Sequence, residues 1–234
     1  MTEELNLATY LYICPSKFEI YLFEKNSRKN LYKNQFLFNE KREKIDYEKL
    51  RKFLDENIFK IEKLNGEFVQ NIILILENIE IFNLNIGIKK KNYGTLVKNN
   101  ILKNYLTDAN ELFKENYQNY KILHIIINKY IFNGKSNYIF DDKFEGDNFC
   151  MEIEFKSIPI SLMNELEKTL EKYQIKISQC IEGNYTQNFF SNKNIDISYM
   201  AFKIQNGLNE NEVKLIPKNQ KKQGFFEKFF QLFS

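Results

Sequence analysis

The side chains that most often carry out catalysis are few in this sequence, and their spacing does not bring them together. His124 is the only histidine, and it lies in an apolar stretch typical of a strand, so we expect it to have a structural role. Glu152 and Glu154 alternate with apolar residues, which predicts the solvated face of a strand instead of a catalytic pair. No catalytic triad and no zinc-ligand set can be assembled around His124, and we expect that the protein is not an enzyme.

Metal and redox chemistry also lack the required spacing. Asp141, Asp142 and Glu145 fall in an expected hairpin loop, but the downstream glutamate that would complete a calcium loop is missing. A solvated turn is the simpler interpretation. The cysteines are far apart and form no C-x-x-C motif, which favours a reducing compartment and argues against a zinc site. They are Cys14, Cys150 and Cys180. We therefore expect no bound metal.

Positive charge is concentrated near the end of the sequence. The 234 residues have a formal net charge of +3, and residues 213–234 contribute +4 from five lysines and one glutamate. The rest of the chain is close to neutral, which argues against a nucleic-acid-binding protein. Residues 89–91 are all lysine and could attract an acidic partner, although a charged strand end is the simpler interpretation. We recognise no signal peptide, and the longest apolar run, 72–76, is too short to span a bilayer.

The apolar periodicity predicts an α/β protein. Residues 8–38 alternate in the manner of strands. Residues 46–66 have helical spacing, with Asp46 as the N-cap and Gly66 at the end. Residues 71–76 form the continuous apolar run that is typical of a strand buried on both faces.

A second group of elements follows. The sequence predicts a strand at 79–88, a helix at 97–115, and strands at 122–127 and 149–155. Pro159 then begins a helix, residues 175–181 form a strand, and a weaker helix covers 195–207.

Two stretches carry a family resemblance. The first matches the pattern L-H-x-I-x-x-x-Y-x-I-x-G, with one departure at Phe132, through Leu123, His124, Ile126, Tyr130, Phe132 and Gly134. The second corresponds to a closing D-P-x-Y-A-x-A-x-G-L stretch through Asp196, Tyr199, Ala201, Gly207 and Leu208. With the order of elements, these stretches resemble the bacterial cell-division protein FtsA.

The resemblance implies a fold and its boundaries. Residues 5–77 and 158–208 would form a ribonuclease-H-like domain 1A, which is half of an actin-like ATPase fold. Residues 78–157 would form an inserted strand–helix–strand–strand (SHS2) subdomain, called 1C. After Ile181 about fifty residues remain, where FtsA-like proteins have a second half made of domains 2A and 2B.

The phosphate turn of the family is degenerate in this sequence. FtsA-like proteins begin with D-I-G-T/S-S-K, and the aligned residues here are Tyr12, Ile13, Cys14, Pro15, Ser16 and Lys17. Tyr12 replaces the aspartate, and Cys14 replaces the glycine that lets a phosphate approach the backbone. Pro15 lacks an N–H donor. The second phosphate loop, D-x-G-G-G-T, has no counterpart, so we expect no nucleotide and no other cofactor.

Residues 224–234 have the spacing of an amphipathic helix, after an expected polar linker at 209–223. The apolar arc and its lysines are Phe225, Phe226, Phe229, Phe230, Leu232, Phe233, Lys221, Lys222 and Lys228. This composition predicts a weak, reversible tether to an anionic membrane surface, and FtsA-like proteins end in such a helix. Docking on the protein's own sheet and binding in a partner's groove are the alternatives.

The main functional hypothesis is a non-enzymatic, membrane-tethered FtsA-like scaffold of bacterial cell division, on the cytoplasmic face of the inner membrane and at midcell. Its expected partners are other division proteins or full-length FtsA, bound through the 1C-like subdomain. The family contacts FtsZ through domain 2B, which puts FtsZ binding in doubt. The alternative is a PilM-like adaptor of a pilus-assembly or secretion system. PilM-like proteins usually partner a membrane protein, so the phenylalanine-rich end favours division.

Overall fold

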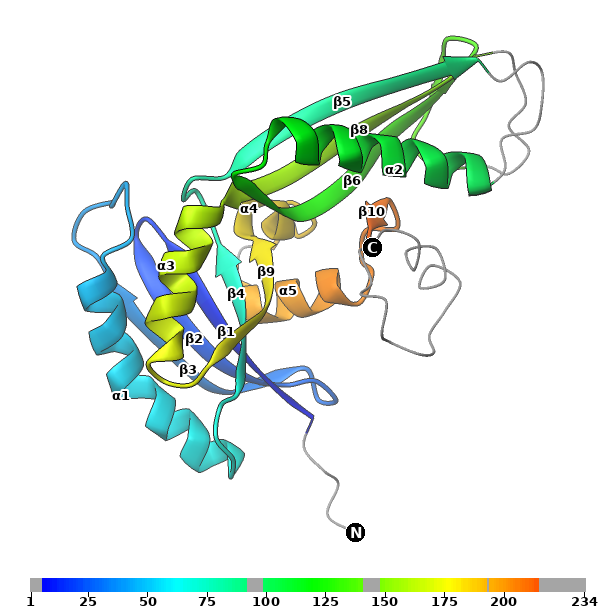
Figure 1. The fold of residues 1–234 in the computed structure, drawn as a ribbon. Helices are drawn as coiled ribbons and strands as arrows, with labels where there is room; N and C mark the ends of the chain where they lie inside the picture. Colours follow the sequence, from blue (N-terminus) through cyan, green and yellow to red (C-terminus); the bar gives the residue numbers. More distant parts are fainter. Residues whose placement is uncertain (1–5, 92–98, 141–147, 193, 215–234) are drawn as a thin grey trace. The chain divides into compact units, whose positions relative to one another are not determined.

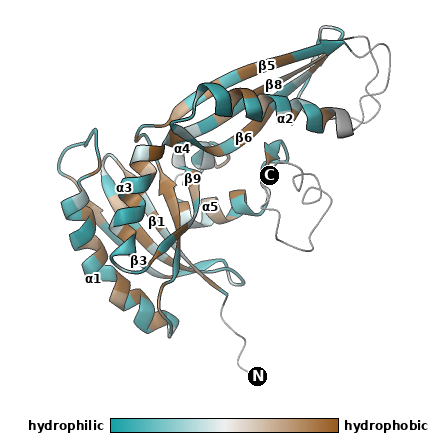
Figure 2. Ribbon diagram, in the orientation of Figure 1, coloured by the Kyte–Doolittle hydropathy of each residue, from teal (hydrophilic) through white to brown (hydrophobic). Residues whose placement is uncertain are grey.

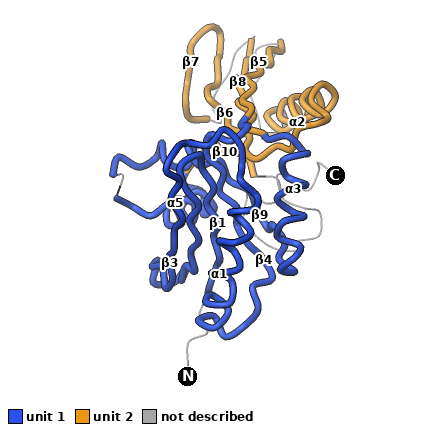
Figure 3. The backbone as a smooth tube through the Cα atoms, turned by 90° about the vertical axis from the view of Figure 1, so that its left-hand side faces the viewer, with its two compact units in different colours: residues 1–81, 158–208 blue, residues 82–157, 209–234 orange. Residues whose placement is uncertain are grey.

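The computed structural model describes residues 6–91, 99–140, 148–192 and 194–214 (Figure 1). The chain divides into two compact units, shown in different colours in Figure 3. The first unit contains residues 1–81 and 158–208, and the second contains residues 82–157 and 209–234. No helix among the described residues combines the length and apolar character needed to cross a bilayer.

The first unit is built on a five-stranded mixed sheet. Its strands are β1 (Leu7–Cys14), β2 (Lys17–Glu24), β3 (Lys29–Leu37), β4 (Asn71–Leu76) and β9 (Lys176–Glu182). The order is β3-β2-β1-β4-β9, with β1 antiparallel to β2 and parallel to β4. Strand β3 continues the antiparallel part, and β9 lies parallel to β4. This is the ribonuclease-H-like order, so the predicted fold class is confirmed.

Helices cover both faces of this sheet, which explains the continuous apolar runs of β1 and β4. On one face, side chains of β1, β4 and β9 pack against α5 (Ile197–Gln205). The short α4 (Gly183–Gln187) follows β9. Helices α1 (Tyr47–Asn65) and α3 (Ile160–Glu171) cover the other face (Figure 1).

The ends of α1 lie where its sequence predicts. Asp46 accepts a hydrogen bond from the Lys49 backbone N–H at 3.1 Å, which satisfies one of the free donors of the first turn. Gly66 has a φ of 77°, the left-handed conformation that ends many helices and that glycine adopts without strain. Both predicted helix boundaries are confirmed.

The second unit places one helix on a five-stranded sheet. Its elements are β5 (Phe82–Lys91), α2 (Asn99–Asn116), β6 (Tyr120–Phe132), β7 (Lys135–Asn137), β8 (Asn148–Pro159) and β10 (Glu212–Val213). The sheet order is β10-β6-β8-β5, and β7 pairs with β6. Apart from β7 and β10, this is the strand–helix–strand–strand order that the sequence predicts.

The two faces of this second sheet differ in polarity, as the alternating colours of β5 and β8 in Figure 2 show. Phe155 of β8 is fully buried and stacks on Phe113 of α2, with ring centroids 4.9 Å apart. Residues of the opposite face form ion pairs, such as Lys129 with Glu152 at 3.1 Å. The prediction that Glu152 and Glu154 lie on a solvated face, and not in a catalytic pair, agrees with this arrangement.

The predicted polar linker at 209–223 differs from the structure at its beginning. Residues Glu212 and Val213 form β10, which pairs antiparallel with Ile126 and Ile125 of β6. The Glu212 carboxylate lies 2.6 Å from Nδ1 of His124. Because a strand of two residues has no detectable period, the sequence pattern could not reveal it. Residues 215–223 lie outside the described part of the chain.

Candidate functional site

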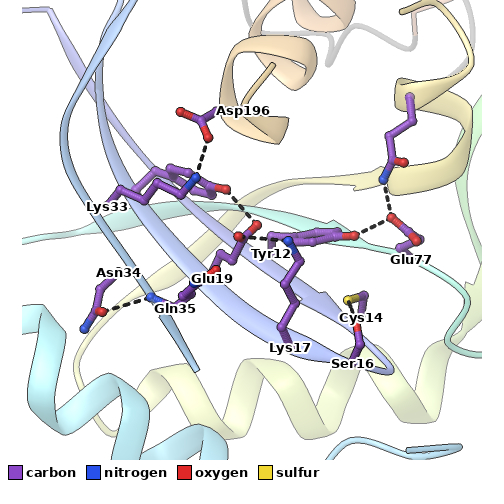
Figure 4. A network of polar contacts seen from close by, with 12 residues as sticks. Tyr12, Cys14, Ser16, Lys17, Glu19, Lys33, Asn34, Gln35, Glu77 and Asp196 are labelled. Carbon is purple, nitrogen blue, oxygen red and sulfur yellow. Dashed lines mark hydrogen bonds and ion pairs between the residues drawn. The ribbon is translucent and has the colours of Figure 1, made fainter. Parts of the chain in front are cut away.

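A cavity of about 740 Å³ in the first unit lies beside the turn between β1 and β2, which is the position of the phosphate turn in the resemblance. Its lining includes Tyr12, Cys14, Lys17, Glu19, Glu77 and Asp196. Figure 4 shows these side chains directed toward one another from β1, β2, the end of β4 and the start of α5. Because several polar side chains converge on this cavity, we take it as the candidate site.

The turn itself is a tight two-residue hairpin. Cys14 of β1 pairs with Lys17 of β2, so that only Pro15 and Ser16 connect the strands. The carbonyl oxygens of both turn residues accept backbone N–H groups at 2.8 Å, from Arg42 and Phe38 respectively. A phosphate-binding turn presents N–H groups to the anion. Pro15 has no N–H, so the substitution that the sequence shows removes a donor in the folded turn as well.

In the resemblance, Tyr12 aligns with the aspartate of the phosphate turn, and the structure places it in a partly buried cluster of hydrogen bonds. Its hydroxyl donates to Oε2 of Glu77, and the amide of Gln187 donates to the same oxygen. Burial raises the pKa of Tyr12 far above its ordinary value, and the hydrogen bond to Glu77 acts in the same direction. Tyr12 therefore stays neutral and acts as a donor, whereas an aspartate would order metal-bound water.

Close packing at Gly183 completes this cluster. A Cβ atom on Gly183 would lie 2.7 Å from Cβ of Glu77, which is closer than such contacts occur. The absence of a side chain therefore allows the first turn of α4 to approach the end of β4. Glu182, just before it, accepts hydrogen bonds from the backbone N–H groups of Asn184 and Tyr185. These contacts fix α4 and so position Gln187 against Glu77.

Both lysines that line the cavity are ion-paired within the chain. Nζ of Lys17 lies 2.9 Å from Oε1 of Glu19. The other carboxylate oxygen of Glu19 accepts a hydrogen bond from the hydroxyl of Tyr21 at 2.7 Å. Burial raises the pKa of Tyr21 far above its ordinary value, and the charge of Glu19 adds to the effect. Lys33 lies 2.5 Å from Oδ1 of Asp196. Neither ammonium group is therefore available in the way that a phosphate-binding lysine is.

The charges of the cavity disfavour a polyphosphate. Three carboxylates, of Glu19, Glu77 and Asp196, face two ammonium groups, which gives a formal charge of −1. An anionic ligand that paired with Lys17 or Lys33 would compete with Glu19 or Asp196, whose carboxylates would then lack their partners. Cys14 contacts Ser16 with 3.2 Å between Sγ and Oγ, without a general base beside either. Among the described residues, no group of histidine, cysteine and acidic side chains could hold a metal ion.

The resemblance singled out Tyr12, Cys14, Pro15, Ser16 and Lys17 as a degenerate phosphate turn. In the structure these residues form the end of β1, the turn and the start of β2, and all but Pro15 line the cavity. Sequence reasoning missed the carboxylates and the second lysine, which are Glu19, Lys33, Glu77 and Asp196. The alternation of Lys17, Glu19 and Tyr21 could have placed Glu19 beside Lys17, because residues two apart on a strand share a face.

Two groups of predicted residues lie outside the described part of the chain. The first is the expected hairpin loop with Asp141, Asp142 and Glu145. The second is the expected membrane-binding set, from Lys221 to Phe233. His124 lies in β6 and is bound to Glu212, which fits the structural role expected for it.

Comparisons with known proteins do not show a family for this chain. No protein-family model matches the sequence, and no curated protein matches it either. Among solved structures, a PilM–PilN type IV pilus biogenesis complex is similar, with 8% sequence identity and a TM-score of 0.48. The match covers 78% of this chain and 49% of the other chain. A second similar structure is the cytoplasmic domain of EpsL, an inner-membrane component of the type II secretion system of Vibrio cholerae. It has 8% sequence identity and a TM-score of 0.36, and the match covers 77% of this chain and 57% of the other chain.

A third similar structure is a Bacteroides thetaiotaomicron protein with an actin-like ATPase fold and unknown function. Its identity is 11%, the coverages are 80% of this chain and 57% of the other, and the TM-score is 0.33. This chain therefore spans about half the length of these solved structures. At such identities and TM-scores the likeness assigns no residue role, so the roles of residues follow from the geometry of this chain alone.

Proposed function

We propose that this protein is a nucleotide-independent adaptor with half of an actin-like fold, which binds other proteins of a membrane-associated assembly. The observation that carries the proposal is that side chains of the chain itself bind one another where the resemblance places a phosphate. Tyr12, held by Glu77, stands in place of the aspartate, and the lysines beside it are bound to carboxylates of the same chain. A protein of this fold that no longer binds a nucleotide still has the surfaces through which it can bind other proteins.

The assembly that the adaptor serves is the finer part of the proposal. Two of the three similar structures described above come from a pilus-biogenesis complex and a secretion system, and none of the three is described as a division protein. We therefore place the pilus or secretion adaptor first as the candidate to test. The division scaffold is the second candidate, and the sequence stretches at 123–134 and 196–208 favour it.

The nucleotide part of the proposal is tested by titrating the full chain with Mg-ATP in a calorimeter. We expect no heat of binding at ATP concentrations up to about 1 mM, which corresponds to a binding free energy weaker than about −4 kcal/mol. As a control, Tyr12→Asp with Cys14→Gly tests whether the two family residues alone restore binding. We expect that they do not, because the carboxylates of Glu19, Glu77 and Asp196 remain. Micromolar affinity of the natural chain for ATP would overturn the proposal.

The membrane tether, which rests on residues outside the described part of the chain, is also a proposal. Pelleting with vesicles that contain anionic lipid should be lost in a Phe226→Asp, Phe229→Asp variant, because a carboxylate on the apolar arc opposes insertion. Gln231→Asp adds a carboxylate to the polar arc and should retain most of the binding. Equal pelleting of all three proteins would contradict the tether.

The choice between the two assemblies is tested by the position of the protein in cells. A fluorescent protein fused to the N-terminus leaves residues 224–234 free. Discrete foci at the cell periphery, away from the division plane, are the result expected of a pilus or secretion adaptor. A band at midcell would instead support the division scaffold. Removal of residues 217–234 should make either pattern diffuse.

A further inference from the structure

The edges of the two sheets differ in regularity. In the first unit, the pairing of edge strand β3 with β2 shifts register between Leu22 and Phe23, and that of β9 with β4 shifts between Ile72 and Ile73. Such irregularities discourage the addition of a further strand. In the second unit, β10 and β7 pair with parts of β6.

Strand β5 differs from the edge strands β3 and β9, because its pairing is regular along its whole length. It pairs with β8 over all ten of its residues, from Phe82 opposite Ser157 to Lys91 opposite Asn148, without a register shift. Its other edge pairs with no strand among the described residues, where β5 is the last strand of the sheet order. The strand contains neither a proline nor a bulge, which are the usual protections of an edge. Within the strand itself, lysines 89–91 at one end are the feature that would discourage a further strand.

Apolar side chains of β5 are incompletely covered in the unit. Leu84, Ile86 and Ile88 pack against the core beneath α2 and remain only half-buried. The alternating residues of the opposite face, including Asn83, Asn85 and Gly87, are exposed. A strand added to this edge would cover the apolar row if it carried a similar row on the same face.

The sequence of β5 is complementary to itself in the antiparallel direction. If two copies are related by a two-fold axis at Ile86, then Leu84 lies opposite Ile88 and Asn83 lies opposite Lys89. Lys90 lies opposite Phe82, so no lysine faces a lysine. A parallel pairing in register would place all three lysines of one copy against those of the other, which is unfavourable.

We propose that β5 is a homodimerisation edge, through which two copies of this chain pair antiparallel about Ile86 and join their second-unit sheets. Isologous pairing of this kind is closed and leads to dimers instead of filaments. Because one strand edge is a small contact, a free dimer should be weak. Tethering both copies to one surface would raise its population.

The first experiment measures the mass of the full chain by sedimentation equilibrium between about 10 µM and about 500 µM, a range suited to weak interfaces. We expect a monomer–dimer equilibrium. Gly87→Lys should raise the dimer dissociation constant at least about tenfold, because it adds a charge beside the axis in each copy. Gly87→Thr should keep or strengthen the dimer, because threonine favours strands. Both side chains fit the free monomer, since no atom lies within 4 Å of the position of a Cβ on Gly87.

The second experiment tests the register by oxidation. Ile86→Cys places a thiol opposite its own copy, whereas Ile88→Cys, on the same face and also half-buried, places it opposite Leu84. Disulfide-linked dimer should form several-fold faster in the first variant, because directly opposite residues come within disulfide reach. A chain that is monomeric at every concentration overturns the proposal. Equal effects of Gly87→Lys and Gly87→Thr, or equal cross-linking of the two cysteine variants, would overturn it too.

Discussion

At the scale of the residue, the hydroxyl of Tyr12 is bound to Glu77, at the position where the resemblance aligns an aspartate. We expect Tyr12→Phe to lower the free energy of unfolding by about 1–2 kcal/mol, because a hydrogen bond to the partly buried Glu77 carboxylate is lost. Chemical denaturation measures the change. Tyr138→Phe is the control, because Tyr138 is 69% exposed and should change stability by less than about 0.5 kcal/mol. Equal stabilities of the two variants would show that the Tyr12 hydroxyl is not needed.

The tyrosines of the cavity also predict the response to alkaline pH. The folded-state pKa values of Tyr12 and Tyr21 lie above the ordinary value of 10.0. Their contribution to stability is therefore complete below pH 10.0 and is lost as pH rises above it, because the unfolded chain then ionises more readily. Denaturation at a series of pH values should show this fall, and Tyr12→Phe should reduce it. An unchanged pH dependence in Tyr12→Phe would contradict the assignment.

Two buried asparagines offer a matched comparison. Asn57 accepts hydrogen bonds from Tyr32 at 2.6 Å and Asn34 at 2.7 Å, whereas Oδ1 of Asn110, in α2, has no partner in the described structure. Asn110→Leu should raise the free energy of unfolding by about 1 kcal/mol, since it removes an unsatisfied acceptor. Asn57→Leu should lower it by about 1–3 kcal/mol, since it leaves other groups unpaired. Destabilisation of similar size in both variants would show that Oδ1 of Asn110 is satisfied in solution.

At the scale of the element, the position of α4 depends on Gly183. Gly183→Ala should lower the free energy of unfolding by about 1–3 kcal/mol, because its Cβ would overlap Glu77. Gly87→Ala has open space around the new methyl group and should have little effect. Thermal and chemical denaturation of both variants provide the comparison. If Gly183→Ala is as stable as Gly87→Ala, the end of β4 and the start of α4 are not as closely packed as described.

Strand β10 is an element of the second unit in spite of its distance in sequence. Its residue Glu212 binds His124, and Ile127 donates its N–H to the carbonyl of Asn211 at 3.0 Å. Both contacts hold residues 211–213 to one edge of β6. Residues 211–213 are therefore connected to the second unit through β6.

At the scale of the whole molecule, this connection predicts the effect of shortening the chain. A protein that ends after Lys214 should unfold with the stability of the full chain, because it retains β10. A protein that ends after Leu208 should be less stable by about 1–3 kcal/mol, because it loses β10 and leaves the buried side chain of His124 without Glu212. Denaturation of the two shortened proteins measures the difference. Equal stability would mean that β10 contributes little.

The sequence by itself determined the longer helices and strands, but not the short elements α4, β7 and β10, and it determined which residues form the turn between β1 and β2. Asp46 and Gly66 mark the ends of α1, and the apolar run at 71–76 marks the buried strand β4, because caps and burial act through neighbouring residues. The resemblance supplied the order of the sheet. Pro15 removes a donor whatever the rest of the chain does.

Only the tertiary structure decided which polar side chains meet in the lining of the cavity. Tyr12 and Glu77 are 65 residues apart, Glu77 and Gln187 are 110 apart, and Lys33 and Asp196 are 163 apart. Hydrophobic periodicity reports which face of an element is buried, but it does not report which polar groups of distant elements meet. The pairing of β10 with β6 likewise depends on hydrogen bonds across the chain, and a two-residue strand is too short to have a pattern of its own.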